Sequence, residues 1–593
     1  MIQFSIKNHW PAFLLAVCVG LIILLPTVLS IKRLGPGNFK GIYPMFSDDE
    51  DHYLAEVKEV YDGHWGLGNP YLKENKIMPY TQPPLGPMYY AGFAKLFGIS
   101  VPVAAGINDF LLPFVAVLLL YNFFFLLTQS KKISLSFSAL FFIFFLSAFN
   151  RPVNPQLSLI FLLAGLYLVW LIVDRKYDTE KILTLNLLLS LAFGILVYIS
   201  PFYWMTLVVL YVLLTFFRAW LEKNFKYCLK NWLCFFTPSF IWSIPFFLNV
   251  KKIIESSSFV ETSLRSGFIS THVIGSFINV AIIFACLPIV YLVQKISLAR
   301  PASAEATVWQ SKKIVFLGYS LIISGIILNW QNVLTGKIIQ FSPHFYPIII
   351  LFVFIISTVS WTYIDWKKFS KNSFTMLCFL LILLTAIFYK QKNEILYAFK
   401  IIHSPKNVSS VQTLSPIMDW LNNNTALDST IYALGRDYSW AIPIYTYDNL
   451  YFNSNAGLSL MSDIEIENRW TIQHFFEPVN EKYIKDNARE IWTNKFIEVY
   501  QSLESRRTIL QFITRKMYSE TTLADDFYIN RVLDADIKFK NIGFEKAIKT
   551  YAVDYVILDK SYNQYVDLAV KFKSYKSLTL LVKIGDTLIY KVN

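Results

Sequence analysis

The sequence predicts an α-helical polytopic membrane protein with a separate C-terminal α/β domain. Hydrophobic residues make up 55% of the chain, and the mean hydropathy is +0.43. The apolar residues are gathered into runs close to the roughly 20 helical residues that cross ~30 Å of hydrocarbon. These runs recur from Pro11 to Tyr389 and then stop. Charged residues lie almost entirely between the runs, because an unpaired charge in lipid is costly. This pattern excludes a soluble enzyme.

About eleven membrane spans are predicted. They are residues 11–30, 110–128, 133–149, 157–173, 182–199, 201–217, 232–250, 272–294, 314–330, 346–364 and 374–390. The first span is interpreted as an uncleaved helix and not as a signal peptide. It is too long for a signal peptide, contains Pro26 and is followed by Ile31-Lys32-Arg33 instead of a small-residue cleavage site.

The short loops predict the orientation of the chain, because lysine and arginine collect on the cytoplasmic side of membrane proteins. One set of short loops holds Lys7, Lys131, Lys132, Arg175, Lys176, Lys181, Arg218, Lys223, Lys226, Lys230, Lys295, Arg300, Lys312, Lys313, Lys367, Lys368 and Lys371. The opposite set holds Arg151, Lys251, Lys252, Arg265 and Lys337. We therefore expect a multi-pass protein of the cell (inner or plasma) membrane with a cytoplasmic N-terminus and an extracytoplasmic C-terminal domain. The same bias explains the net charge of +13, so no nucleic-acid partner is expected.

Two extracytoplasmic segments are too long to be simple connections. The loop 31–109 joins the first two spans and is assigned, with the spans, to a transmembrane domain of residues 1–390. The tail 391–593 is expected to form an extracytoplasmic α/β domain. It alternates strand-like runs at 430–434, 553–558 and 578–582 with helical stretches at 411–423 and 484–517. All five cysteines lie in or beside spans, so this domain is expected to fold without disulfides.

The loop 31–109 contains four consecutive acids, Asp48-Asp49-Glu50-Asp51, followed by His52-Tyr53. The spacing of the residues that follow predicts a helix, with Asp49, Tyr53 and Glu56 on one face. Two interpretations stay open on the residues alone. In the first, Ser47 and Glu50 form a capping box and the acids complement the helix dipole. In the second, one of the acids is a catalytic base, because four acids exceed what a cap requires.

A second motif follows at Pro83-Pro84, where paired prolines can begin a helix. The segment continues through Tyr89-Tyr90 to Leu96-Phe97-Gly98 and has an apolar, aromatic face. By itself this segment predicts an amphipathic helix at the membrane interface.

Together the two motifs resemble the C-type glycosyltransferase (GT-C) superfamily, most nearly the protein mannosyltransferases and lipid A aminoarabinose transferases. Asp49-Glu50-Asp51-His52-Tyr53 matches an Asp-Glu-x-(His/Arg)-(Tyr/Phe) signature, and Pro83-Pro84-Leu85 with Tyr89-Tyr90 resembles the family's proline-aromatic helix. The order of one span, a long outer loop, many spans and an outer domain also fits. The match covers about residues 46–98. It departs at Gln82, where the aminoarabinose transferases usually have lysine.

The resemblance implies that Asp49 is the catalytic carboxylate with Glu50 beside it, and that His52 and Tyr53 contact the substrate. The implied donor is a sugar on a polyprenyl phosphate, and the acceptor is a lipid, a glycan or a protein. Phosphate is a weakly basic leaving group, so one carboxylate that takes the proton of the acceptor hydroxyl is sufficient. Direct displacement would invert the anomeric centre.

Side chains near the outer face are candidates for binding the donor phosphate. They are Arg151, Lys251, Lys252, Arg265, Lys337, His344 and Tyr346. Each has an ordinary alternative. Arg151 can be an interfacial anchor, the loop 251–271 can be merely solvated, and His344 can be a hydrogen-bonding cap. The resemblance favours His344, because the family often places a basic or His/Tyr motif before this late span.

No cofactor or metal is expected. The acids and His52 could supply ligands for a divalent ion, but the branch that the chain resembles generally uses none. Two other functions stay open. A transporter would place charges or broken helices at mid-membrane, and the span interiors hold few charges. A non-catalytic GT-C-fold partner in cell-envelope polysaccharide assembly would keep the fold without the activity.

Overall fold

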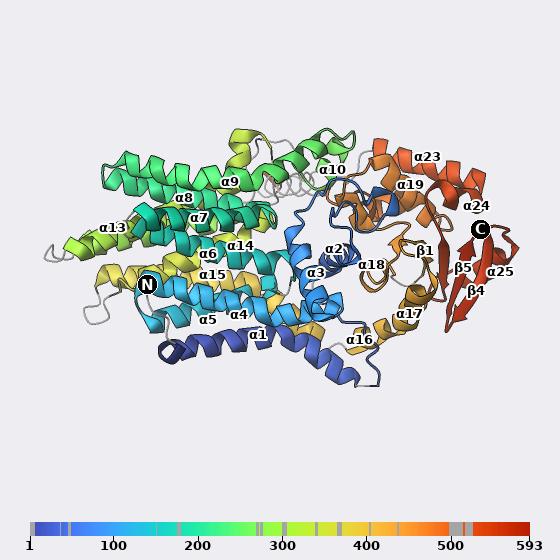
Figure 1. Cartoon of the computed structure of the whole chain (residues 1–593), viewed down its shortest axis with the longest axis horizontal. Coiled ribbons are helices and arrows are strands. Elements are labelled where there is room, and N and C mark those ends of the chain that lie inside the picture. Colours follow the sequence, from blue (N-terminus) through green and yellow to red (C-terminus); the bar gives the residue numbers. More distant parts are fainter. Residues whose placement is uncertain are drawn as a thin grey trace. The chain divides into compact units, whose positions relative to one another are not determined.

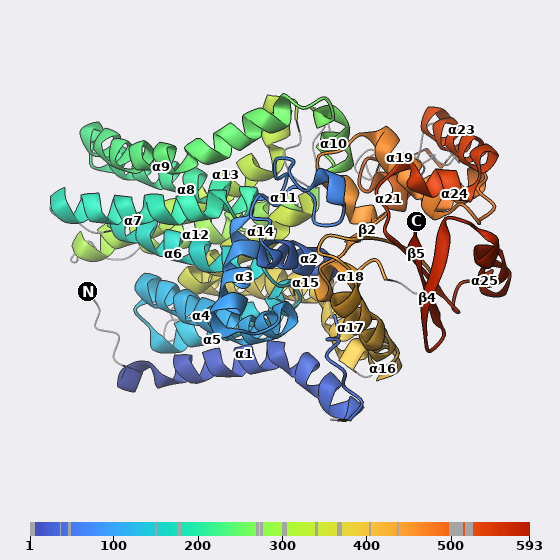
Figure 2. The same cartoon turned by 45° about the vertical axis from the view of Figure 1, so that its right-hand side comes forward.

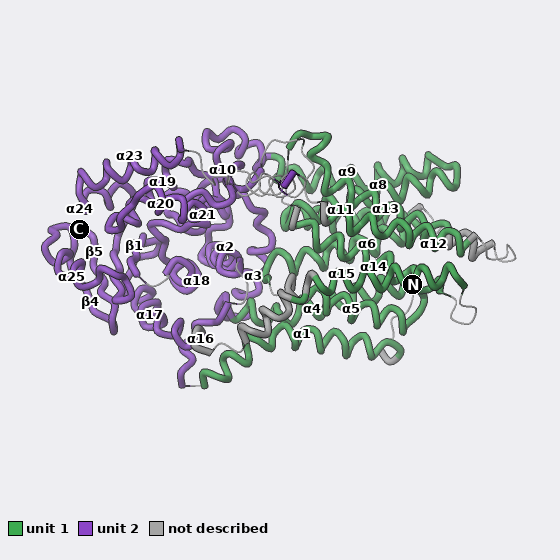
Figure 3. The backbone as a smooth tube through the Cα atoms, turned by 180° about the vertical axis from the view of Figure 1, so that it is seen from behind, with its two compact units in different colours: residues 1–35, 103–247, 270–405 green, residues 36–102, 248–269, 406–593 purple. Residues whose placement is uncertain are grey.

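The computed structural model describes most of the chain. The described residues are 6–35, 37–45, 49–149, 151–174, 179–268, 272, 277–298, 305–337, 342–364, 370–402, 405–435, 438–496, 511, 514–515 and 526–593. They form two compact units, which Figure 3 shows in different colours. The membrane unit comprises residues 1–35, 103–247 and 270–405, and the α/β unit comprises residues 36–102, 248–269 and 406–593.

The membrane unit consists of long helices that run alongside one another (Figure 1). They are α1 (Ile6–Leu34), α4 (Val101–Thr128), α5 (Lys131–Phe149), α6 (Asn154–Asp174), α7 (Thr179–Val197), α8 (Pro201–Leu221), α9 (Phe225–Ile254), α11 (Phe277–Phe284), α12 (Leu287–Leu298), α13 (Glu305–Thr335), α14 (Ser342–Trp361) and α15 (Lys371–Ile402).

The predicted fold class is confirmed. Within the described residues, ten helices are long and apolar enough to cross a membrane, and each corresponds to a predicted span. The remaining predicted span, 133–149, coincides with α5, which is a helix of 19 residues. One of these ten helices, Asn279–Ser297, corresponds to the predicted span 272–294 and is interrupted near Cys286, where α11 ends and α12 begins.

Packing in the membrane unit follows from apolar faces and small residues. The segment Ile348–Ile356 of α14 is buried at every position, as expected for a helix that is hydrophobic all round and central in its bundle. Glycines allow close helix approach. A Cβ atom at Gly165 of α6 would lie 2.7 Å from the Leu207 side chain of α8, and one at Gly318 of α13 would lie 2.8 Å from Val290 of α12.

The α/β unit is built on a five-stranded sheet of order β2-β1-β3-β5-β4. The strands are β1 (Thr430–Leu434), β2 (Asn449–Leu450), β3 (Tyr555–Asp559), β4 (Leu578–Ile584) and β5 (Thr587–Val592). β1 pairs in parallel with β2 and β3, and β5 pairs antiparallel with β3 and β4. β3 is buried at all five positions and lies in the centre, whereas β4 has exposed residues and lies at an edge. The three predicted strand runs coincide with β1, β3 and β4.

The α/β unit also contains helices and short turns. They are α2 (Glu50–Asp62), η1 (Lys73–Asn75), α3 (Leu85–Phe97), α10 (Phe259–Arg265), α16 (Pro405–Val411), η2 (Gln412–Leu414), α17 (Ser415–Asn424), α18 (Ile442–Tyr445), η3 (Ser454–Leu458), α19 (Asp463–Gln473), α20 (Glu481–Asp486), α21 (Ala488–Trp492), α23 (Asp526–Ile542), α24 (Phe544–Ala547), η4 (Ile548–Thr550) and α25 (Tyr565–Ser574). The predicted helix 411–423 corresponds to η2 and α17. The predicted helix 484–517 begins with α20 and α21 and then enters residues outside the described part of the chain.

The compact units differ from the sequence-based division at residue 390. That division assigns the loop 31–109 to the transmembrane domain, whereas residues 36–102 pack with the C-terminal residues 406–593. The loop needs partners for its backbone, and the tail supplies them. The Lys40 amide donates to the Gln412 side chain (2.9 Å), and the Tyr43 amide donates to the Tyr445 hydroxyl (2.9 Å).

Candidate active site

The acidic motif forms the start of α2, which packs against α3 and α18 within the α/β unit (Figure 2). Asp49 is the N-cap residue and Glu50 is the first helical residue, and both are half-buried. Carboxylates at a helix N-terminus are stabilised by the helix dipole. The helix ends at Gly63, whose φ of 115° suits glycine. The predicted helix is therefore present, with its acids at the N-terminal end.

The capping-box interpretation receives no support from the described residues. A box from Ser47 to Glu50 would begin the helix directly after Ser47, whereas α2 begins at Glu50 with Asp49 as N-cap. Asp49 makes no side-chain capping hydrogen bond. Ser47 and Asp48 lie outside the described residues.

His52, the residue that directly follows the four acids, is buried, with 7% of its surface exposed. Its Nδ1 forms a hydrogen bond with the Tyr71 hydroxyl (2.9 Å), and its Nε2 accepts a hydrogen bond from the Gln82 amide (2.8 Å). The His52 and Tyr71 rings are stacked. Burial lowers the pKa of His52 to about 4, so the ring is neutral. Because both ring nitrogens bind within the unit, the predicted substrate contact of His52 is corrected to a structural one.

Glu56 is buried beside His52, and the sequence pattern assigned no role to it. Its side chain lies one turn after His52, with 3.5 Å between Glu56 Oε1 and His52 Nε2, and only 2% of the residue is exposed. Its Oε2 has no hydrogen-bond partner in the described part of the chain. Burial raises the pKa of Glu56 to about 8, so the carboxyl is mainly protonated at neutral pH. The one sequence feature that pointed to Glu56 was its position on the same helix face as Asp49.

The contact between Gln82 and His52 gives a structural reason for the one departure from the family pattern. Gln82 precedes the paired prolines, where the aminoarabinose transferases usually have lysine, and here its amide binds His52. A lysine at this position would place a positive charge against the buried, neutral ring. The proline pair does begin a helix as predicted, since Pro84 is the N-cap of α3. Tyr53, the other predicted substrate contact on α2, is half-buried next to the His52 ring.

Arg265 is corrected from a phosphate-binding candidate to a structural residue. It is 0% exposed. Its guanidinium donates to Gly457 O (2.8 Å) and Thr262 Oγ1 (3.1 Å), and also to the Asp463 carboxylate and to Met461 O. The Arg265 guanidinium therefore donates four hydrogen bonds within the α/β unit, and the Asp463 carboxylate neutralises its charge.

The two lysines of the same loop are placed differently. Lys251 and Lys252 lie exposed in the last turn of α9. Lys251 lies 3.7 Å from Glu255, an exposed pair that contributes little to stability. Lys337 is also exposed, directly after α13 in the membrane unit. These three residues stay candidates without a defined site.

Arg151 and His344 are brought together in the membrane unit. His344 stacks on Phe202, with ring centroids 5.4 Å apart, and the charge of Arg151 acts on both His344 and Tyr203. Phe202 and Tyr203 lie in the first turn of α8, and His344 lies in the first turn of α14. Arg151 precedes α6 by three residues. The first turns of α8 and α14 therefore meet at Phe202 and His344, and Arg151, before α6, lies within electrostatic range of His344.

Three polar atoms at the starts of α6 and α8 lack partners in the described part of the chain. Ser200 Oγ, Trp204 Nε1 and Asn154 Oδ1 are buried without a hydrogen-bond partner in the described part of the chain. Helix N-termini attract anions through their free N–H groups and dipoles. Tyr346, the last predicted contact, lies half-buried one residue after Phe345 in α14.

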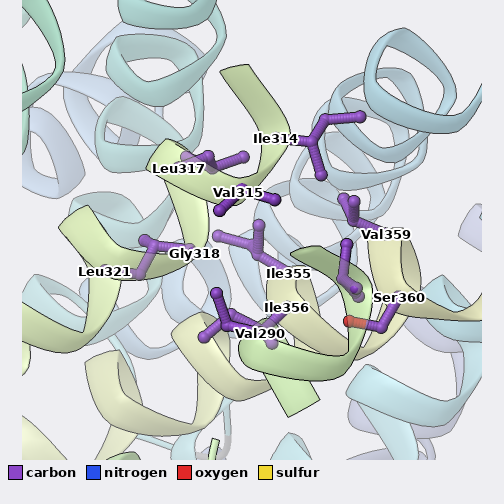
Figure 4. A pocket seen from close by; sticks show the side chains of 11 residues that line it. Val290, Ile314, Val315, Leu317, Gly318, Leu321, Ile355, Ile356, Val359 and Ser360 are labelled. Carbon is purple, nitrogen blue, oxygen red and sulfur yellow. The ribbon is translucent and has the colours of Figure 1, made fainter. Parts of the chain in front are cut away.

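A separate crevice in the membrane unit is apolar. It lies among α12, α13 and α14 and is lined by Val290, Leu317, Ile355 and neighbouring aliphatic side chains, with Ser360 as the polar member (Figure 4). Ser360 is near the end of α14, about 24 Å along the helix from His344 at 1.5 Å per residue. The crevice is therefore distinct from the Arg151–His344 region. Among the described residues, no group of three His, Cys, Asp or Glu side chains is placed to hold a metal.

Comparison with known proteins gives fold neighbours. No protein-family model and no curated protein matches the sequence. ArnT of Cupriavidus metallidurans in the apo state, a lipid A aminoarabinose transferase, is 13% identical, with 99% of this chain and 98% of that chain covered and a TM-score of 0.42. The oligosaccharyltransferase of Archaeoglobus fulgidus in the apo form is 10% identical, with 100% and 89% covered and a TM-score of 0.42. Both neighbours have the GT-C fold.

Proposed function

We propose that this protein is a membrane glycosyltransferase that transfers a sugar from a polyprenyl-phosphate donor to an extracytoplasmic lipid, glycan or protein, with inversion. The observation that carries the proposal is the first turn of α2. Asp49 and Glu50 are half-buried at its N-terminal end, within the Asp-Glu-x-His-Tyr sequence, and His52 is fixed beneath them. A motif that served only as a cap would not require this buried support.

The proposed reaction needs one base. The acceptor hydroxyl oxygen forms a bond with the anomeric carbon while the bond from that carbon to the phosphate oxygen breaks. The hydroxyl proton passes to the Asp49 carboxylate, and the polyprenyl phosphate leaves with the bonding electron pair. Glu50, the neighbouring acid, is proposed to orient the acceptor. Attack opposite the leaving group inverts the anomeric centre.

The donor phosphate is proposed to bind at Arg151 and His344. The support is the stacking of His344 of α14 on Phe202 of α8, with Arg151 within electrostatic range of His344. The buried Ser200 hydroxyl and Trp204 indole N–H at the start of α8 also have no partner among the described residues. Charge-assisted hydrogen bonds and helix N-termini would stabilise the negative charge that develops on the leaving group.

Replacement of Asp49 by asparagine tests the proposal. The change preserves the size of the side chain and removes its basicity, and general base catalysis typically contributes about 10²- to 10⁴-fold. Transfer by purified protein in nanodiscs, measured with a panel of polyprenyl-phosphate sugars, is expected to fall at least 100-fold while donor binding persists. Asp48→Asn is the matched control, because Asp48 lies one position outside the signature.

Two results would contradict this proposal. Full activity of Asp49→Asn would show that the acid is not the base. A wild-type protein that binds the donors but transfers none of them to any acceptor would favour the non-catalytic role.

A further inference from the structure

The turn η3 of the C-terminal region contacts two other segments of the α/β unit through three consecutive backbone carbonyls. Asn69 Nδ2 donates to Ala456 O (3.3 Å), Arg265 Nε donates to Gly457 O (2.8 Å), and Thr81 Oγ1 donates to Leu458 O (2.9 Å). These bonds tie the loop 36–102 and the segment 248–269 to a turn that follows the acidic motif much later in the sequence.

One chain of hydrogen bonds links η3 to His52 Nδ1. The Tyr71 hydroxyl binds His52 Nδ1 (2.9 Å). Tyr71 is itself held, because Asn69 Oδ1 accepts from the Tyr71 amide (3.0 Å) while Asn69 Nδ2 binds η3. The Leu450 amide, shortly before η3 in the chain, donates to Tyr71 O (2.9 Å).

A second chain of hydrogen bonds links η3 to the other ring nitrogen. Thr81 binds Leu458 O, and the next residue, Gln82, donates to His52 Nε2. His52 is therefore fixed at both nitrogens by chains that begin in the same turn. It lies in the first turn of α2, three residues after Asp49.

We propose that η3 positions the acidic motif, and that Asn69, Tyr71 and Thr81 are positioning residues that act through His52 on Asp49. A base must meet the acceptor hydroxyl at hydrogen-bond distance, and a misplacement of 1 Å can cost about 100-fold in rate. The C-terminal region thereby contributes to catalysis without supplying a reacting group. This inference rests on the proposed function of Asp49.

Tyr71→Phe is the first test, because it removes one hydroxyl and keeps the ring. Tyr432→Phe is the matched control. Tyr432 is equally buried in the same unit, and its hydroxyl donates to Ile472 O (2.9 Å), away from α2. Tyr71→Phe is expected to lower kcat by about 10- to 100-fold with little change in the KM for the donor. Tyr432→Phe is expected to leave kcat per folded molecule unchanged.

A double-mutant cycle tests whether the residues act along one chain. If Asn69 acts through Tyr71, the fall in kcat for Asn69→Ala with Tyr71→Phe will be smaller than the product of the two single effects. Asn69→Ala with Tyr432→Phe should be multiplicative. Multiplicative effects in both pairs, or equal kcat values for Tyr71→Phe and Tyr432→Phe, would overturn the inference.

Amide hydrogen exchange tests the positioning independently of catalysis. Tyr71→Phe and Thr81→Val are expected to speed exchange in the first turns of α2, whereas Tyr432→Phe is not. Unchanged exchange in α2 in both variants would overturn the inference even if transfer cannot be measured. Asp49→Asn, assayed in parallel, separates the two hypotheses. Full activity of that variant removes the proposed function, whereas its inactivity with a normal Tyr71→Phe removes only the positioning role.

Discussion

Replacement of Glu56 by glutamine should stabilise the protein increasingly as the pH rises. Burial raises the pKa of the Glu56 carboxyl from an ordinary 4.5 to about 8. Between these values the unfolded chain carries an ionised carboxylate that must take up a proton on folding. The wild type therefore loses stability as the pH rises from about 4.5 to about 8, and the loss is complete above that range. Glutamine is neutral over the whole pH range, so the Glu56→Gln variant does not undergo this loss of stability.

The magnitude follows from the shift. One pKa unit corresponds to about 1.4 kcal/mol, so the proton uptake by Glu56 costs about 3 kcal/mol at pH 7. Glu56→Gln should match the wild type near pH 4.5, exceed its free energy of unfolding by about this amount at pH 7, and reach a plateau above pH 8. The measurement is unfolding of the protein in nanodiscs across pH 4.5–9, with amide exchange in α2 as the local probe.

Glu59→Gln is the matched control on the same helix. Glu59 is also buried, but its carboxylate lies 2.6 Å from Lys76 Nζ and 3.2 Å from His64 Nδ1. Loss of this buried carboxylate leaves the half-buried Lys76 and His64 with one partner fewer, so Glu59→Gln should destabilise by on the order of 1–3 kcal/mol. A Glu56→Gln difference that does not vary with pH, or that has the sign of Glu59→Gln, would refute the protonated state of Glu56.

Three further outcomes are expected. Arg265→Met should destabilise the α/β unit by about 3–5 kcal/mol, because it leaves a buried carboxylate with fewer partners; in the folded fraction, donor affinity should be unchanged, and a loss of affinity there would restore Arg265 as a donor ligand. Arg151→Ala and His344→Ala should each weaken donor binding by about 1.5–3 kcal/mol without unfolding, as titration calorimetry can measure. Protease added to right-side-out spheroplasts should cut residues 391–593 and spare the loop 223–230; protection of the C-terminal region would reverse the topology.

The membrane spans were predictable from local composition. A span needs only a long apolar run free of charge, and that property is written in each 20-residue segment. The helix at the acidic motif and the strands β1 and β3 were predictable for the same reason. β5 was missed, although Gly585-Asp586 before it is a turn signal between two runs that pair as β4 and β5.

The roles of individual polar residues could not be predicted from the local sequence, because they depend on contacts with residues far away in the chain. Arg265 and Asp463 are 198 residues apart, and no pattern around either of them indicates the buried pair that they form. The same holds for His52, whose motif position suggests a substrate contact. Its ring nitrogens are occupied by residues 19 and 30 positions later, and these are held in turn by η3.

By itself, the sequence determined that the chain crosses a membrane many times, that an acidic helix follows the first span, and that a mixed α/β region ends it. These properties depend on hydrophobic runs and periodicity, which act over short stretches. Only the tertiary structure decided that the loop 36–102 folds with the C-terminal region, that His52 and Glu56 are buried and neutral, and that Arg265 is paired. Burial and hydrogen bonding between distant segments set the protonation and availability of a side chain, and a one-dimensional pattern does not contain them.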